Sequence, residues 1–109
     1  DLAMALPPQL SEAERRAALQ RAASARKKRS QYKAEIKSGA RKWTDALSDS
    51  DPDIRKMRVR ELIESIPGYG TTRTILIMER AGISPTRRVQ GVGNNQLQNL
   101  LRLMKEVDS

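Results

Sequence analysis

Cysteine and histidine are both absent from this sequence of 109 residues. Without cysteine the chain has no disulfide, no thiolate nucleophile and no cysteine-ligated metal, and it fits a reducing compartment. Without histidine it lacks the usual zinc ligands and any Ser-His or Cys-His catalytic pair. We therefore expect no cofactor and no metal site.

Aromatic residues and long apolar runs are also scarce. The aromatic residues are Tyr32, Trp43 and Tyr69, 3% of the chain. They are too few to offer the several exposed rings on which single-stranded nucleic acids stack. No apolar run approaches the length that spans a bilayer, and no signal-peptide pattern opens the chain. These absences predict a soluble, cytoplasmic protein with no membrane partner.

Positive charge, in contrast, is plentiful. The 21 lysines and arginines outnumber the 13 acidic residues, which gives a net charge of +8 and a pI near 10.4. At neutral pH such a chain is attracted to polyanions. Nucleic acid therefore ranks ahead of an anionic membrane surface as the expected partner.

The acidic residues do not indicate catalysis. Glu61 and Glu64 lie one helical turn apart, and three aspartates cluster near residue 50, but none has a neighbouring histidine or the spacing of metal ligands. They are typical of capping and solvent-facing carboxylates. We expect no enzymatic activity.

A long helix is predicted over residues 11–38. Ser11 follows a proline pair and precedes Glu14 by three residues, which is the pattern of a capping box. Strong helix formers continue without glycine or proline over about 40 Å. The large apolar residues of this helix are Leu19, Tyr32 and Ile36. We therefore expect its end to dock on a core and its alanine-rich start to lie in solvent or on a partner, after a flexible N-terminus over residues 1–10.

Shorter helices are predicted to build a compact domain over residues 39–109. Trp43 is expected to anchor its core, and Asp51 followed by Pro52 marks a helix start. The predicted helices span residues 42–47, 52–57, 59–66 and 71–80, and a last helix runs from a cap at Asn94 or Asn95 through Met104. No segment has the alternation of a strand. The sequence thus predicts an all-α fold, in which a long basic N-terminal helix precedes this compact domain.

The most distinctive motif is Gly68-Tyr69-Gly70, called the first turn below, between two predicted helices. Glycines adopt backbone angles that other residues resist, so the tyrosine can turn inward while consecutive N–H groups face outward as a nest for an anion. The helix that begins at Thr71 would add its free N–H groups and its dipole, and Arg73 would add a full charge. The alternative is a glycine cap in an ordinary helix hairpin.

A second turn, Gly91-Val92-Gly93, repeats this arrangement ahead of the last helix. Arg87 and Arg88 lie on the connector beside it. Asn94 and Asn95 follow it and can donate to phosphates or to base edges. The alternative is a solvated loop with an asparagine cap.

The long helix carries a dense run of cations with few acids to neutralise it. Such a run repels itself unless an anionic surface lies alongside, whereas the alternative is a solvated charged face. The cations favoured for DNA contact are Arg26, Lys27, Lys28, Arg29 and Lys33.

The order of these motifs resembles a known family. The two turns are similar to those of the helix-two-turns-helix domain found in a small-subunit ribosomal protein and in some DNA glycosylases. The opening Met4-Ala5-Leu6-Pro7-Pro8, the basic helix, Met57-Arg58-Val59 and Thr86-Arg87-Arg88-Val89-Gln90 narrow this likeness. With them, the whole chain resembles the actinobacterial, mycobacterial-type integration host factor family.

The resemblance implies a nucleoid-associated protein that binds duplex DNA with little sequence preference, bends or compacts it, and assists phage site-specific recombination. The implied partners are double-stranded DNA and a phage integrase complex, and we expect a monomer in solution. Carried over by position, the contacts are the basic helix, the first turn with the helix start after it, and Arg87, Arg88 and residues 91–93. Thr71 stands where members tend to have lysine, and Gln90 where a third basic residue is common, so both turns carry less charge.

Two other functions remain open at this point. An RNA- or ribosome-associated protein is one alternative, because phosphate nests do not distinguish the sugars of DNA and RNA. A protein-interaction adaptor with a solubilising basic helix is the other. The sequence also leaves open whether two DNA-contacting surfaces would bend one duplex or bridge two.

Overall fold

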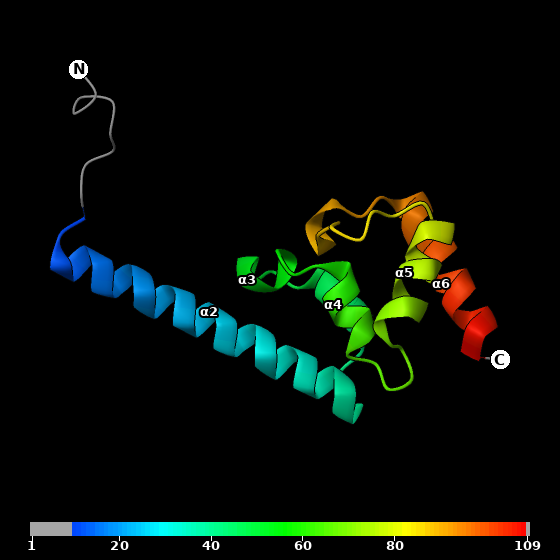
Figure 1. Cartoon of the computed structure of the whole chain (residues 1–109), viewed down its shortest axis with the longest axis horizontal. Coiled ribbons are helices and arrows are strands. Elements are labelled where there is room, and N and C mark those ends of the chain that lie inside the picture. Colours follow the sequence, from blue (N-terminus) through cyan, green and yellow to red (C-terminus); the bar gives the residue numbers. More distant parts are fainter. Residues whose placement is uncertain (1–9, 109) are drawn as a thin grey trace, which may run out of the picture.

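The computed structural model describes residues 10–108, and Figure 1 shows how its helices are arranged. Residues 1–9, most of the predicted flexible N-terminus, and residue 109 lie outside the described residues. Helix α2 (Glu12–Ser38) forms one long bar, α3 and α4 pack beside it, and α5 and α6 lie beyond α4 on the side away from the start of α2. Within residues 10–108 there is no strand, which confirms the all-α prediction, and no helix is both long and apolar enough to cross a membrane.

Helix α2 begins and docks as the sequence predicts. The Ser11 hydroxyl accepts from the N–H of Glu14 at 3.1 Å, and the Glu14 carboxylate accepts from the N–H of Ser11 at 3.5 Å, so the capping box forms. Near the other end Tyr32 and Ile36 are buried in the core, whereas Leu19 is 66% exposed. The end of the helix is therefore fixed to the domain, and its start projects away from it.

The remaining elements are short. They are the 3₁₀ helix η1 (Trp43–Ser48), α3 (Pro52–Arg55), α4 (Val59–Glu64), α5 (Thr71–Arg80), the 3₁₀ helix η2 (Val89–Gly91) and α6 (Asn94–Asp108). Asp51 caps α3 as predicted, because its carboxylate accepts from the N–H of Asp53 at 2.9 Å. Helix α6 continues past the predicted end at Met104.

Three predicted helices differ from the structure. The segment predicted as an α-helix over residues 42–47 is the 3₁₀ helix η1. Helix α3 ends before Met57, whose N–H donates to the carbonyl of Ile54 three residues earlier, and α4 ends before Ile66, whose N–H donates to Ile63 in the same way. These tighter bonds close the last turns early, so both helices are shorter than their apolar spacing predicts.

The core lies between the short helices and the end of α2. Its buried apolar side chains are Tyr32, Ile36, Trp43, Ala46, Ile54, Met57, Val59, Leu62, Ile63, Tyr69, Ile77, Met78, Ala81, Ile83, Val89, Leu100 and Met104. Trp43 is buried as expected. Helices of four to fifteen residues are marginal in isolation, so this shared core holds both turns in place.

Tyr69, the middle residue of the first turn, connects that turn to the last helix. Its side chain is buried, and its hydroxyl donates to the Asp108 carboxylate at 2.7 Å, with the Met104 carbonyl at 3.4 Å. Burial, together with the hydrogen bond to Asp108, raises the pKa of Tyr69 to about 12. The turn is thus anchored through a protonated phenol.

We expect Tyr69→Phe to lower the free energy of unfolding at neutral pH by about 1 kcal/mol, because one buried hydrogen bond is lost. The pKa of this phenol is higher in the folded chain (about 12) than its ordinary value of 10.0. Its contribution is therefore complete below pH 10 and is lost as the pH rises toward 12. Urea unfolding of both proteins across this range should show the difference between them shrinking, and a constant difference would contradict the anchor.

Candidate nucleic-acid interface

Three basic residues of α2 form one row beside the buried face of the helix. Arg29, Lys33 and Lys37 are spaced four residues apart, beside the row of Tyr32 and Ile36 that is buried. Residues four apart lie on one face of a helix, so docking of the buried row sets where these cations lie. Lys33 has a distant ion pair, with its ammonium 3.9 Å from the Glu61 carboxylate.

Lys28, in contrast, is held by acidic residues of the domain. Its ammonium lies 2.9 Å from the Asp51 carboxylate and 3.0 Å from that of Asp53. The hydrogen bonds that the Lys28 ammonium donates to these two carboxylates raise the pKa of Lys28 and lower the pKa of Asp51. Because acids of another element neutralise it, Lys28 is the member of the predicted cation cluster least available to an outside anion.

Arg26 and Lys27, two other predicted contacts, are exposed and make no ion pair within residues 10–108. They lie on α2 directly before Lys28, outside the lining of both hollows described below. A partner that lies along α2 can reach them, but they take no part in the surfaces formed with the two turns.

The first turn confirms the inward tyrosine and corrects the predicted nest. Gly68 has φ +91°, the left-handed conformation that favours glycine, whereas Gly70 has the ordinary value of −77°. The N–H of Tyr69 does not face outward, since it donates to the carbonyl of Ile66 at 3.1 Å. A left-handed residue after Pro67 reverses the chain and turns that N–H back onto the preceding helix.

The open donors of the first turn lie one residue later, at the start of α5. Gly70 caps α5 without any side chain bonding to the helix start, and the N–H groups of Gly70, Thr71 and Thr72 have no partner within the described chain. There is no acidic residue in the first turn of α5. These donors and the helix dipole therefore offer an anion site.

Arg73 lies over this turn. Its guanidinium donates to the Gly68 carbonyl at 3.0 Å and lies 5.9 Å from the centre of the Tyr69 ring. The side chain remains exposed. It therefore adds a full positive charge at the first turn and also braces that turn.

The row on α2 and the first turn meet in one hollow, called the first hollow. Lys33 and Lys37 of α2 line it together with residues 67–70, and Glu64 is its acidic residue. Glu64 is paired with Arg60 at 3.0 Å, which reduces its repulsion of an incoming anion. The first hollow thus combines two cations of α2 with the glycine-rich backbone.

The second turn is not a nest. The N–H of Gly91 donates to Arg88, that of Val92 to Val89, and that of Gly93 to the side chain of Gln96. Neither Gly91 nor Gly93 has a positive φ. The 3₁₀ helix η2 and the Gln96 side chain satisfy the donors that the prediction assigned to an anion.

Gln96 also replaces the predicted asparagine cap. Helix α6 begins at Asn94, so Asn94 and Asn95 lie in its first turn, and both are exposed. The side-chain oxygen of Gln96 reaches back to the N–H of Gly93 at 3.1 Å, as in the second half of a capping box. The asparagines remain free to contact an outside partner.

Arg87 and Arg88 differ in availability. The Arg87 guanidinium donates to the Gly91 carbonyl at 3.3 Å, and its Nε atom is buried without a partner. Arg88 is exposed, and its guanidinium donates to the Lys56 carbonyl at 3.3 Å. Arg87 therefore braces the second turn, whereas Arg88 presents its charge to solvent.

A second hollow joins Arg88 to α2. Arg29 of α2 lines it together with Lys56, Arg58 and Arg88, and Asp53 and Glu61 are its acidic residues. Residues 57–59, at the start of α4, pair with residues 87–89 of the connector through two hydrogen bonds. The N–H of residue 59 donates to the carbonyl of residue 87, and the N–H of residue 89 donates to the carbonyl of residue 57. Sequence reasoning did not select Lys56 and Arg58, because only this long-range pairing brings them to the second turn.

Known proteins match this chain over most of its length. Residues 36–104 match the family described as the S13-like H2TH domain. The integration host factor of Streptomyces coelicolor is 44% identical over 101 residues, which cover 91% of this chain and 94% of that protein. The integration host factor of Mycobacterium tuberculosis is 41% identical over 100 residues, which cover 90% and 94%. This chain belongs to the integration host factor family.

A solved structure supports the same assignment. The structure described as sIHF bound to an 8bp palindromic DNA is 40% identical to this chain and superposes with a TM-score of 0.72, covering 76% of this chain and 96% of that one. The resemblance drawn from the sequence is therefore confirmed. The free donors at the start of α5 lie beside Thr71, which has no charge, so Arg73 is the cation nearest to them along the chain.

The two glycines of the first turn are expected to differ in stability. Gly68→Ala should lower the free energy of unfolding by about 1 kcal/mol, because alanine resists a φ of +91°. Gly70→Ala should stay within about 0.5 kcal/mol, since a Cβ there meets nothing within 4 Å and the loss of a favourable cap opposes the reduced freedom of the unfolded chain. Urea unfolding measures both, and equal losses would contradict the geometry of the turn.

Proposed function

We propose that this protein binds double-stranded DNA through its phosphate backbone, with little sequence preference, as an architectural protein. The observation that carries this proposal is the convergence of α2 with the first turn and with Arg88, which lies beside the second turn. Arg29 and Arg88 share one hollow, and Lys33 and Lys37 share the other with the glycine-rich first turn. Cations and free backbone donors are the groups that bind phosphates irrespective of base sequence.

The proposed contacts follow the availability of each residue. Arg88, Arg29, Lys33 and the N–H groups at the start of α5 bind phosphates, and Arg73 adds charge at the first turn. Arg87 holds the second turn in shape. The proposed supplementary contacts are Arg26 and Lys27, along the exposed part of α2, and Asn94 and Asn95, at the start of α6.

Duplex DNA is favoured over structured RNA by the relatives. The solved relative with a TM-score of 0.72 is described as bound to an 8bp palindromic DNA. Competition between a DNA duplex and an RNA duplex of the same sequence and length, at one fixed salt concentration, tests this preference. Tighter binding of the RNA duplex would replace this function with an RNA-associated one.

We further propose that one duplex contacts both hollows and is bent, rather than two duplexes being bridged. Arg29 and Lys37 are eight residues apart on one face of α2, which is a rise of about 12 Å. A single backbone segment can span that distance. The bent duplex would act in the nucleoid and in phage integrase complexes, with the protein binding as a monomer. A circular-permutation gel shift measures bending, and mobility that is independent of site position would contradict it.

Affinity falls as salt rises, and Arg88→Ala is expected to reduce the magnitude of the slope of log affinity against log salt by about 0.9. The loss of affinity should be similar on unrelated duplexes. One phosphate contact fewer releases one counterion fewer. Arg102→Ala is the matched control, because it removes the same formal charge from an exposed α6 side chain that pairs with Glu106 at 3.5 Å. Fluorescence anisotropy from low to physiological salt measures both slopes. Equal slopes for Arg88→Ala and wild type would remove Arg88 from the interface.

Gly70→Ala is expected to weaken DNA binding about tenfold and to leave the salt slope unchanged. The added Cβ would stand in the open space beside the free N–H groups and keep a phosphate at a distance, which costs about one hydrogen bond to a charged group. No charge is removed, so counterion release stays the same. Wild-type affinity in a variant of wild-type stability would show that the start of α5 does not bind phosphate.

A further inference from the structure

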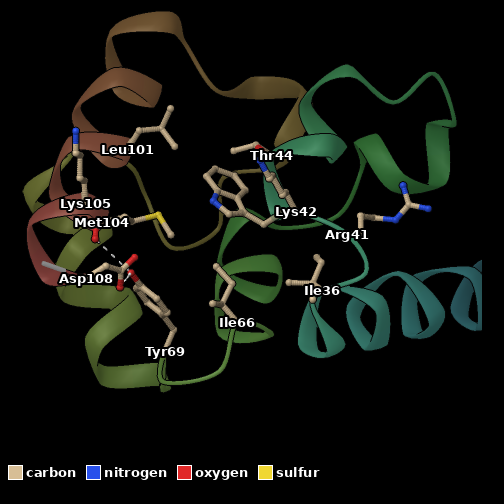
Figure 2. A pocket seen from close by; sticks show the side chains of 12 residues that line it. Ile36, Arg41, Lys42, Thr44, Ile66, Tyr69, Leu101, Met104, Lys105 and Asp108 are labelled. Carbon is tan, nitrogen blue, oxygen red and sulfur yellow. Dashed lines mark hydrogen bonds between the residues drawn. The ribbon is translucent and has the colours of Figure 1, made fainter.

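A pocket lies between the end of α2, η1 and α6, beyond the two hollows that carry the proposed function (Figure 2). Its volume is about 520 Å³, which is within the range of small-molecule sites. Figure 2 shows Ile36 and Ile66 next to each other, with Met104 and Leu101 on the α6 side. The walls are therefore apolar and come from segments far apart in the sequence.

The pocket contains a hydrogen-bond donor that the protein leaves unused. Trp43 lines the pocket and is only 5% exposed. Within residues 10–108 its indole N–H has no hydrogen-bond partner. This group is not fully enclosed by the protein, so a ligand can reach it. A buried tryptophan usually finds a partner for this group, so the free N–H suits an acceptor on a ligand.

The charges at the rim indicate the sign of that ligand. Lys42 and Lys105 are both exposed, and neither takes part in an ion pair within the described part of the chain. Arg41 pairs with Glu35 at 2.7 Å. Asp108 accepts from the neutral Tyr69 hydroxyl at 2.7 Å and keeps its negative charge. The two free ammonium groups outnumber this one carboxylate, so the rim has an excess of positive charge.

We propose that this pocket binds a small organic anion with an apolar body, of the class of medium-chain or aromatic carboxylic acids. The apolar body packs on Ile36, Ile66 and Leu101, and the carboxylate accepts from the indole N–H and lies near Lys42 and Lys105. A purely polar anion such as inorganic phosphate would leave the apolar walls wet, and a cation would meet the two ammonium groups. The site does not need DNA.

The pocket shares two residues with the first hollow. Ile66 and Tyr69 line both. A ligand in the pocket would therefore contact the Tyr69 side chain, whose backbone forms part of the first turn.

The test uses octanoate as the probe, with octylammonium as a matched cation of the same chain length. Trp43 is the sole tryptophan of the chain, so its fluorescence and its single indole N–H signal in NMR spectra both report on this pocket. We expect octanoate to change the fluorescence saturably and to shift the N–H signal downfield. Octylammonium should bind at least tenfold more weakly. Equal affinities, or no saturable change with octanoate, would overturn the proposal.

Charge reversal at the rim separates specific binding from general adsorption. Lys42→Glu with Lys105→Glu should weaken octanoate binding at least tenfold, since both free cations are replaced by anions. Lys27→Glu with Arg26→Glu makes the same change of formal charge on the exposed part of α2 and should leave octanoate affinity unchanged. An equal loss in both double variants would overturn the proposal, and thermal unfolding monitored by circular dichroism establishes that each variant is folded.

Discussion

The burial of Tyr32 and Ile36 of α2 is the contact that orients the surface of this protein. A free basic helix would present its cations in every direction. Two buried side chains one turn apart fix the rotation of the helix, so that Arg29, Lys33 and Lys37 line the two hollows. The segment after α2 is fixed to the helix as well, because the Arg41 guanidinium lies 4.4 Å from the centre of the Tyr32 ring and pairs with Glu35. Apolar packing thus determines an electrostatic arrangement.

The two turns contribute different physical terms. The first turn offers backbone donors at the start of α5, whose effect depends on direction and acts only at contact. The connector beside the second turn offers the charge of Arg88, which acts over a Debye length and weakens with salt. An approaching polyanion is therefore attracted first by α2 and the second turn, and it is positioned by the first turn once it is close.

Local signals in the sequence predict the helices well and the bonding of the turns poorly. The capping box of Ser11 and the cap at Asp51 depend on neighbours within three residues, and both are confirmed. Whether a backbone N–H in a turn is free depends on which carbonyl the chain meets next. The same limit explains Lys28, whose acidic partners lie 23 and 25 residues away. The family, in contrast, could be identified because the order of motifs is itself a sequence property.

The first half of α2 contains no buried residue, since Tyr32 is the first to reach the core. A segment without packing partners places few demands on which side chain stands at each position. Helix formation and net positive charge are the two properties that such a segment must retain. Replacing alanine by glutamine, or arginine by lysine, along this half therefore costs little folding stability. We therefore expect the composition of the first half to be constrained more tightly than its exact sequence. In the second half the exact sequence is constrained as well, because Tyr32 and Ile36 are buried there.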